Sequence, residues 1–253
     1  MTALSPISPS FQKWHVGPEP PVRLFCFPYA GGGAAVFSHW PEVLGRHAAV
    51  YALQLPGHWS RMAEQPVRRL FPLVRGIAEE MLAYVASPFA LFGHSMGALV
   101  AFELARLLRR KYGLCPTHLF VSGFRPPHLP DPHPALYRLP DCELLDRLKT
   151  LGGTPNELLA DSELLSMLLP VIRADLEVCG TYAYTDDVPL PCPITALGGV
   201  DDPLVQSEQM DQWQRHTSSF FRLHLFPGDH FYLLSARQRL LTTVSNALKG
   251  CHA

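Results

Sequence analysis

The chain has 253 residues, of which 47% are hydrophobic and 17% charged, and its formal net charge is -1. This balance excludes a disordered chain, which combines low hydrophobicity with high net charge. It also argues against nucleic acid as a partner, because no basic excess is present to neutralise phosphates. No apolar run approaches the roughly 18 residues that span a bilayer, and the first residues lack a signal-peptide pattern. The six cysteines contain no CxxC pair, which favours free thiols in a reducing compartment. We therefore expect a soluble cytoplasmic protein with no membrane partner.

Buried strand patterns alternate with helical patterns along most of the chain. In chain order we predict a strand at 22–27, a strand at 48–55, a helix at 73–85, a strand at 88–93, a helix at 96–111, a strand at 117–123, a strand at 193–199, a helix at 207–216, a strand at 220–226 and a helix at 236–248. Strands that are apolar on both faces and alternate with helices indicate a mostly parallel sheet covered on both sides. The proline-marked arm before them receives no predicted element.

One segment, residues 125–184, breaks this alternation. It begins at a proline cluster, a second cluster follows it at 189–193, and it is rich in leucine. Its apolar spacing predicts an amphipathic helix at 161–178 that Pro170 should kink. We predict one domain over residues 1–253, with 125–184 as an insertion into it.

A candidate nucleophile stands in Gly93-His94-Ser95-Met96-Gly97, a GxSxG pattern between a predicted apolar strand and a predicted helix. Such a turn exposes the serine at a helix N-terminus, where backbone amides favour developing negative charge. A glycine-rich turn whose serine merely caps a helix is the alternative.

A serine nucleophile needs a base, and the base needs an acid that orients it. His230 follows the strand at 220–226 and occupies the expected place for the base. For the acid, Asp201 and Asp202 share the turn after the strand at 193–199, and the residues alone do not separate them. Asp229, next to the base, would need an awkward backbone. Four other histidines fit places in a strand wall, at a helix end or in loops: His128, His133, His216 and His224.

The oxyanion hole should combine the amide after the nucleophile, Met96, with an amide of the loop FPYAGGG, for which Ala30 is the natural donor. A phosphate-binding role for the glycines of this loop is weakly supported, since GxGxxG and a following Lys-Ser/Thr are missing. Neither HExxH nor paired Cys/His spacings occur, so we expect no metal, and no flavin or nicotinamide fingerprint is visible.

The motifs FCFPYAGGGA, LPGHWSR, GHSMGA, GTYAY and FPGDHFYLL, with the long run LPDCELLDRLKTLGGTPNELLADSELLSMLLPVIRAD, resemble type II thioesterases. These are stand-alone editing enzymes of polyketide and nonribosomal peptide synthases, similar to the medium-chain releasing thioesterase of animal fatty acid synthase. The resemblance implies an α/β-hydrolase fold with Ser95 as nucleophile, His230 as base and Asp202 as acid. It also implies oxyanion amides at Ala30 and Met96. Two positions depart from the family pattern: His58 stands where arginine is common, and Gly180 where glutamate is common.

The resemblance further implies the substrate and the partner. We expect hydrolysis of acyl thioesters carried on the phosphopantetheine of an acyl or peptidyl carrier protein, by a monomer without a cofactor of its own. Residues 125–184 should form a lid that roofs an apolar acyl channel. An acidic carrier helix should dock on basic residues near the mouth, for which we select Arg61, Arg68, Arg69 and Arg125.

Two other functions remain open. A free-standing carboxylesterase or a chain-cyclising thioesterase would share the fold and the catalytic residues. A non-catalytic binding module on a hydrolase fold is the third reading, against which the set of serine, aspartate and histidine argues.

Overall fold

A seven-stranded sheet organises the computed structural model, which describes residues 8, 10–15, 18–133, 135–151 and 162–249. The sheet order is β1-β3-β2-β4-β5-β6-β7. All neighbouring pairs are parallel except β1 and β3. The strands are β1 (Phe11–Trp14), β2 (Val22–Phe27), β3 (Ala48–Leu53), β4 (Phe89–His94), β5 (His118–Ser122), β6 (Ile194–Gly199) and β7 (Phe221–Phe226).

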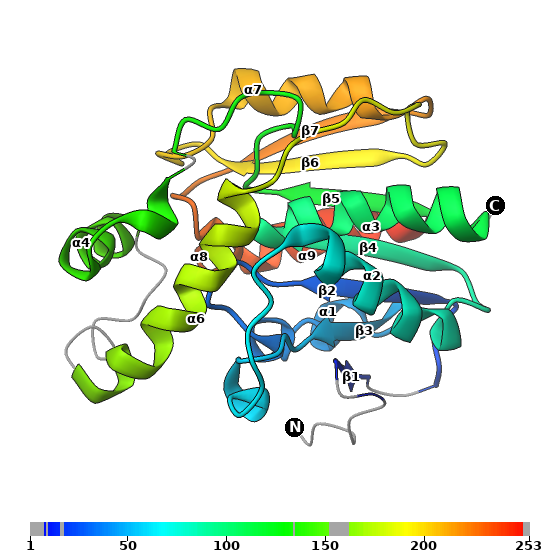
Figure 1. Ribbon diagram of the computed structural model, residues 1–253. Coiled ribbons are helices and arrows are strands. Elements are labelled where there is room, and N and C mark those ends of the chain that lie inside the picture. The colour runs from blue at the N-terminus through cyan, green and yellow to red at the C-terminus, as the bar shows by residue number, and fades with distance from the viewer. Residues whose placement is uncertain (1–7, 9, 16–17, 134, 152–161, 250–253) are drawn as a thin grey trace.

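Helices cover both faces of this sheet (Figure 1). One core joins the sheet to α2 (Leu70–Met81), α3 (Met96–Tyr112) and α7 (Ser207–Asp211). The other core joins it to α1 (Pro41–Leu44), α8 (Tyr232–Ser235) and α9 (Arg237–Lys249). Central strands β3, β4, β5 and β6 are buried along their whole length, as their apolar sequences require. The predicted α/β-hydrolase architecture, a mostly parallel sheet with helices on both faces, is confirmed.

Strand β1 lies in the N-terminal arm, for which the sequence predicts no element. It pairs antiparallel with β3 at the edge of the sheet, with Phe11 opposite Leu53 and Trp14 opposite Val50. The Phe11 ring packs edge-on against Phe25 at 5.3 Å between centroids. The short pattern of two apolar ends around two polar residues is too weak to predict a strand without the sheet edge that it meets.

Several predicted boundaries shift by a few residues. The helix predicted at 73–85 is α2 followed by a 3-10 turn at Leu82–Tyr84, and the helix predicted at 207–216 is α7 followed by a 3-10 helix at Gln212–His216. The helix predicted at 161–178 is α6 (Ser162–Gly180), which contains Pro170.

The helical part of the described segment 125–184 lies at one end of the sheet, to the left in Figure 1. The described part of this segment holds a 3-10 helix at Leu136–Arg138, α4 (Asp141–Leu151) and α6. Arg173 of α6 ties these pieces together by donating to the Leu139 carbonyl at 2.8 Å and pairing with Asp141 at 2.5 Å. Residues 152–161 of the long run that resembles type II thioesterases, which include Gly152 and Gly153, lie outside the described residues.

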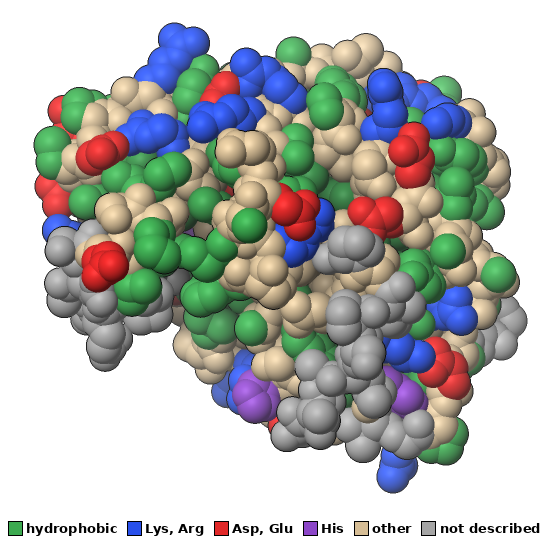
Figure 2. Space-filling model, turned by 60° about the horizontal axis from the view of Figure 1, so that its bottom comes forward, with side chains coloured by type: hydrophobic (Ala, Val, Ile, Leu, Met, Phe, Trp, Pro, Cys, Tyr) green, Lys and Arg blue, Asp and Glu red, His purple; other side chains and the backbone are tan. Residues whose placement is uncertain are grey.

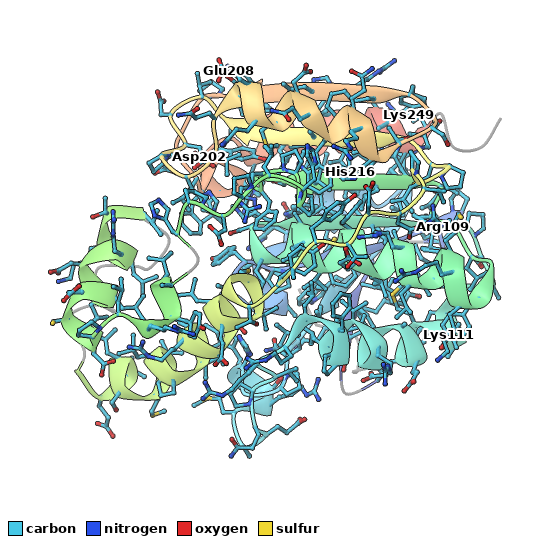
Figure 3. All side chains as sticks on the ribbon, turned by 45° about the horizontal axis from the view of Figure 1, so that its top comes forward. Arg109, Lys111, Asp202, Glu208, His216 and Lys249 are labelled. Carbon is cyan, nitrogen blue, oxygen red and sulfur yellow. The ribbon has the colours of Figure 1, made fainter. Side chains whose placement is uncertain are left out.

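The parallel strands deliver their following loops to this same end of the sheet. Ala30 follows β2, Ser95 follows β4, Asp202 follows β6 and His230 follows β7. Figure 3 shows Asp202 on the side of the molecule where α4 lies, with Arg109 and Lys249 on the opposite side. Within the described part of the chain, no helix is both long and apolar enough to cross a membrane.

Candidate active site

Ser95 occupies a strained turn between β4 and α3. Its backbone has φ 54° and ψ -123°, a conformation that is costly for a residue with a side chain. The surrounding glycines make the turn sterically possible. A Cβ on Gly93 would lie 2.0 Å from the Gly97 carbonyl oxygen, and a Cβ on Gly97 would lie 2.0 Å from the Phe27 carbonyl oxygen. The strand, the turn and the helix can therefore meet only if both positions are glycine. Strain that persists in such a turn is typical of a functional serine.

His230 and Asp202 form a buried pair beside this turn. The carboxylate oxygen Oδ2 of Asp202 accepts a hydrogen bond from Nδ1 of His230 at 2.8 Å. Only 1% of the Asp202 side chain and 4% of the His230 side chain are exposed. The second carboxylate oxygen of Asp202 accepts from the Leu204 amide at 2.8 Å. This arrangement fixes the imidazole ring and leaves its Nε2 as the atom able to take a proton.

The two other candidate carboxylates lie apart from the imidazole ring. Asp201 is exposed, and its amide donates to the Gly228 carbonyl at 3.0 Å. Asp229 is also exposed, and its carboxylate accepts from the Phe231 amide at 2.8 Å. Of the three aspartates left open by composition and spacing, Asp202 is the one that contacts His230.

The glycine-rich loop after β2 folds into a tight turn next to Ser95. The Gly32 amide donates to the Tyr29 carbonyl at 2.9 Å, and Gly31 has φ +77°. A positive φ at the third position is the signature of a type II turn, and glycine adopts it without strain. Ala30 is the second residue of this turn. Met96, whose amide is the other predicted oxyanion donor, is the first residue of α3 and is buried.

Two cavities meet at the candidate nucleophile. The larger, about 270 Å³, extends under α4 and α6 and is largely apolar. The smaller, about 100 Å³, runs past Arg125, Cys179 and Gly180. Both cavities are lined by Ser95, Leu136, Leu176, Leu204 and His230. A substrate whose reacting carbonyl sits at Ser95 can therefore extend in two directions.

Comparison with known proteins places this site in a family. The Thioesterase domain family model matches residues 22–248. The chain belongs to the thioesterase family. The predicted resemblance is thereby confirmed over nearly the whole chain.

Individual relatives of this thioesterase come from several biosynthetic systems. Linear gramicidin dehydrogenase LgrE of Brevibacillus parabrevis is 45% identical over 251 residues, covering 96% of this chain and 95% of that protein. The medium-chain S-acyl fatty acid synthase thioesterase of Rattus norvegicus is 34% identical over 244 residues, with 92% and 91% covered. Among solved structures, the type II thioesterase BorB from the borrelidin biosynthetic cluster is 38% identical. It has a TM-score of 0.85 and covers 93% of this chain and 97% of that one.

Two of the four arginines predicted to dock a partner are mostly buried, which leaves little of either side chain for a partner. Arg61 has 12% of its side chain exposed; it pairs with Glu64 and donates to the Gln54 carbonyl. Arg125 has 10% exposed and donates to the Leu129 carbonyl at 2.8 Å. Both stabilise loops of the thioesterase instead of facing solvent.

The remaining two arginines are about half exposed and stay a prediction. Arg68 and Arg69 both pair with Glu177 of α6, so part of their charge is already neutralised. On the face shown in Figure 2, basic, acidic and hydrophobic side chains are interspersed.

Three buried polar side chains next to the catalytic candidates form a hydrogen-bonded series that the sequence does not predict. His94 Nδ1 lies 2.8 Å from Ser122 Oγ, which lies 2.5 Å from the Tyr232 hydroxyl. Burial, and secondly the nearby His230, hold the pKa of His94 well below its usual value, so this ring is neutral. Its ring centroid is 5.1 Å from that of His230. This hydrogen-bonded group of three side chains therefore packs against the imidazole of His230 through an uncharged ring.

His216 also differs from its predicted role at a helix end. It is buried among the aromatic rings of Phe102 and Trp213. Burial first, then His128 and nearby arginines, lower its pKa to about 4. It is therefore uncharged at neutral pH and offers no positive charge to a helix dipole. Across the described residues, no cluster of three or more His, Cys, Asp or Glu side chains could hold a metal ion.

Proposed function

We propose that this thioesterase hydrolyses acyl groups from the phosphopantetheine arm of an acyl or peptidyl carrier protein, with Ser95, His230 and Asp202 as its catalytic triad. The observation that carries the proposal is the Asp202–His230 hydrogen bond at the cavity that Ser95 also lines. The names of the relatives support the substrate class, since they belong to antibiotic and fatty acid synthesis.

The proposed reaction proceeds through an acyl-enzyme. His230 Nε2 takes the hydroxyl proton of Ser95 as the oxygen attacks the thioester carbonyl, and Asp202 stabilises the resulting imidazolium. The amides of Met96 and Ala30 stabilise the oxyanion, the thiol of the pantetheine arm leaves, and His230 returns the proton to it. Water then attacks the acyl-serine with His230 again as base, releasing the carboxylic acid. No step requires a cofactor of the enzyme.

The two cavities suggest how the substrate lies. The larger, apolar cavity suits the acyl chain, with segment 125–184 as the lid above it. Each methylene buried there contributes about 0.8 kcal/mol, which favours broad tolerance of acyl length over sharp selection. The smaller cavity suits the pantetheine arm. Such an enzyme would clear stalled or mis-primed groups, or release a finished chain, in the cytoplasm.

One relative is named a dehydrogenase, but this chain lacks the features that would support a proposal of oxidoreductase activity. The glycine-rich loop lacks the GxGxxG dinucleotide pattern, and its turn lies against the serine site. A serine esterase is the stronger competing function because it would use the same residues.

A panel of substrates tests the proposal. The enzyme and Ser95→Ala are compared on acyl carrier proteins, on the same acyl groups as free esters, and on a hydroxylated chain able to cyclise. We expect Ser95-dependent release of free acid from the carrier protein, faster than from the free ester. Preference for the free ester would indicate a carboxylesterase, a lactone product a cyclising thioesterase, and no turnover a binding module.

A further inference from the structure

A buried ion pair connects α6 to the loop that follows β3. Asp175 Oδ2 lies 2.9 Å from His58 Nε2, and only 3% and 2% of the two side chains are exposed. The same oxygen accepts a hydrogen bond from the Gly31 amide at 2.7 Å. One carboxylate oxygen therefore joins α6, the His58 loop and the glycine-rich turn. None of these contacts has a part in the reaction as described above.

The geometry requires His58 to be charged. Its Nδ1 lies 3.0 Å from the Pro56 carbonyl, and its Nε2 faces the Asp175 carboxylate. Both partners accept hydrogen bonds, so both ring nitrogens must carry a proton, which is the state of the imidazolium. Burial acts to lower the pKa of His58, but the hydrogen bond and charge of Asp175 and the Pro56 carbonyl outweigh it and raise the pKa. Arg61 of the same loop acts in the opposite direction.

The Gly31 amide is the central peptide of the turn that presents Ala30. Glycine can adopt the positive φ of a type II turn, seen here at +77°, or the negative φ of a type I turn, in which this peptide is flipped. A partner for its N–H group therefore favours the observed orientation. The partner is Asp175. A Cβ on Gly31 would lie 2.7 Å from Ile172 Cγ1, so the turn is also in close contact with α6. The turn is held from one side by a helix of the proposed lid.

The loop that carries His58 is itself fixed to the glycine-rich loop. Gln54 accepts from the Ala34 amide at 3.1 Å and donates to the His58 carbonyl at 2.9 Å. Both partners of Asp175 therefore belong to one hydrogen-bonded unit. Movement of α6 that withdraws Asp175 would leave the Gly31 amide and a buried imidazolium without their partner.

We propose that Asp175, held by the imidazolium of His58, is a positioning residue that fixes the Ala30–Gly31 turn for stabilisation of the oxyanion. Docking of α6 and completion of the oxyanion hole are then one event, so the enzyme is fully active only with the lid helix in place. The inference rests on the proposed function, because Ala30 matters in this way only if Ser95 forms a tetrahedral intermediate. It adds to that function two residues, Asp175 and His58, which contact neither the substrate nor the triad.

The first test is Asp175→Ala, which removes the acceptor of the Gly31 amide, with Glu177→Ala as the matched control. Both residues tie α6 to the rest of the molecule, but Glu177 does so through Arg68 and Arg69 and does not contact the turn. Removing one oxyanion donor costs about 10²- to 10³-fold in kcat, so loss of its support should cost roughly 10- to 100-fold, with KM for a short acyl thioester little changed. Glu177→Ala should change kcat by less than about threefold, as expected of an exposed pair.

The affinity of a boronic acid for the enzyme provides a second readout, which would not change if Asp175 had a purely structural role. The boronic acid adds to Ser95 as a tetrahedral anion, so its affinity should fall in Asp175→Ala by the same factor as kcat. The double variant His58→Phe with Asp175→Leu distinguishes a loss of positioning from a loss of the fold. Apolar replacement of a whole buried ion pair is often tolerated, whereas removal of one partner is destabilising. The double variant should melt near the wild-type temperature, yet show the same loss of kcat and of boronate affinity.

The charge on His58 adds a pH test. Its folded pKa is raised, so the ion pair is present at lower pH and is lost as pH rises through that pKa. Asp175 faces His58 from α6 and Arg61 from its own loop. The nearby thiol of Cys179 on α6 stays neutral because burial raises its pKa. In wild type, kcat should therefore fall on the alkaline side, and His58→Arg, which keeps its charge, should remove that fall.

The outcomes separate this inference from the proposed function. If the wild type shows no Ser95-dependent thioester hydrolysis, the proposed function fails. If the wild type is active but Asp175→Ala and the double variant keep kcat and boronate affinity, or if Glu177→Ala matches their losses, the positioning role is overturned. An alkaline limb that is identical in His58→Arg would overturn the part assigned to the histidine charge.

Discussion

Replacement of Asp202 by asparagine should nearly abolish turnover while preserving the fold. In the native chain one carboxylate oxygen accepts from the Leu204 amide and the other from His230 Nδ1, each at 2.8 Å. The single oxygen of an asparagine will stay with the Leu204 amide, which can only donate. Its NH2 group then faces Nδ1 of His230 and donates to it. The proton of the neutral imidazole is forced onto Nε2, the atom that must accept the proton of Ser95.

The wrong tautomer costs about 10⁴-fold in kcat in a comparable triad, and we expect that magnitude for Asp202→Asn. The assay is release of thiol from a short acyl thioester under single-turnover conditions, with circular dichroism as the check on folding. Asp201→Asn and Asp229→Asn are matched controls, because both side chains are exposed and separate from His230; each should cost less than about tenfold. A large loss in Asp201→Asn, with little in Asp202→Asn, would refute the assignment of the acid.

Three further predictions address the nucleophile, its turn and the lid. A fluorophosphonate should label Ser95 alone, and Ser95→Ala should lose roughly 10³- to 10⁶-fold in turnover; labelling that survives this change, mapped by mass spectrometry, would contradict the role. Gly97→Ala should lower the melting temperature by roughly 4–10 °C, because its Cβ would lie 2.0 Å from the Phe27 carbonyl oxygen; an unchanged melting curve would mean that the close approach is wrong. Amide hydrogen exchange should be faster in the measured peptides of 125–184 than in β4, and slower once Ser95 is acylated; equal, unresponsive exchange would indicate a fixed wall.

The parallel sheet was predictable because its determinants are local. Each central strand is a short apolar run ending at a glycine, proline or polar turn, and each long helix has its own periodicity. The proximity of Ser95 and His230 is predictable for the same reason. Each follows a strand, and the residues after parallel strands gather at one edge of the sheet. Asp202 needed the resemblance, because spacing alone treats it and Asp201 equally.

Contacts between distant parts of the chain were not predictable. Glu103 and Arg106 share a helix face with Arg110 and look like a solvated group, yet both are buried. The two pair with each other at 2.5 Å, and residues far along the chain complete the group: Tyr182 donates to Glu103 at 2.7 Å, and Asp187 lies 3.4 Å from Arg106. Tyr182 and Asp187 lie after α6, far along the chain from α3, and nothing in the sequence of either segment predicts the contact.

The His58–Asp175 pair illustrates the same limit at the site itself. The two residues are 117 positions apart. The sequence signals only that His58 departs from a common arginine, while Asp175 sits unmarked at the end of a leucine-rich helix pattern. Only the packed position of α6 shows that the departure preserves a buried cation opposite a carboxylate.

The most direct test of the account is capture of the acyl group in transit. The enzyme is mixed with a carrier protein bearing an acylated phosphopantetheine, quenched with acid within one turnover, and digested for mass spectrometry. We predict the acyl mass on the peptide that contains Ser95, appearing together with the deacylated carrier protein and decaying as free acid forms. Loss of the acyl group from the carrier without any adduct at Ser95, or equal loss with Ser95→Ala, would contradict the account.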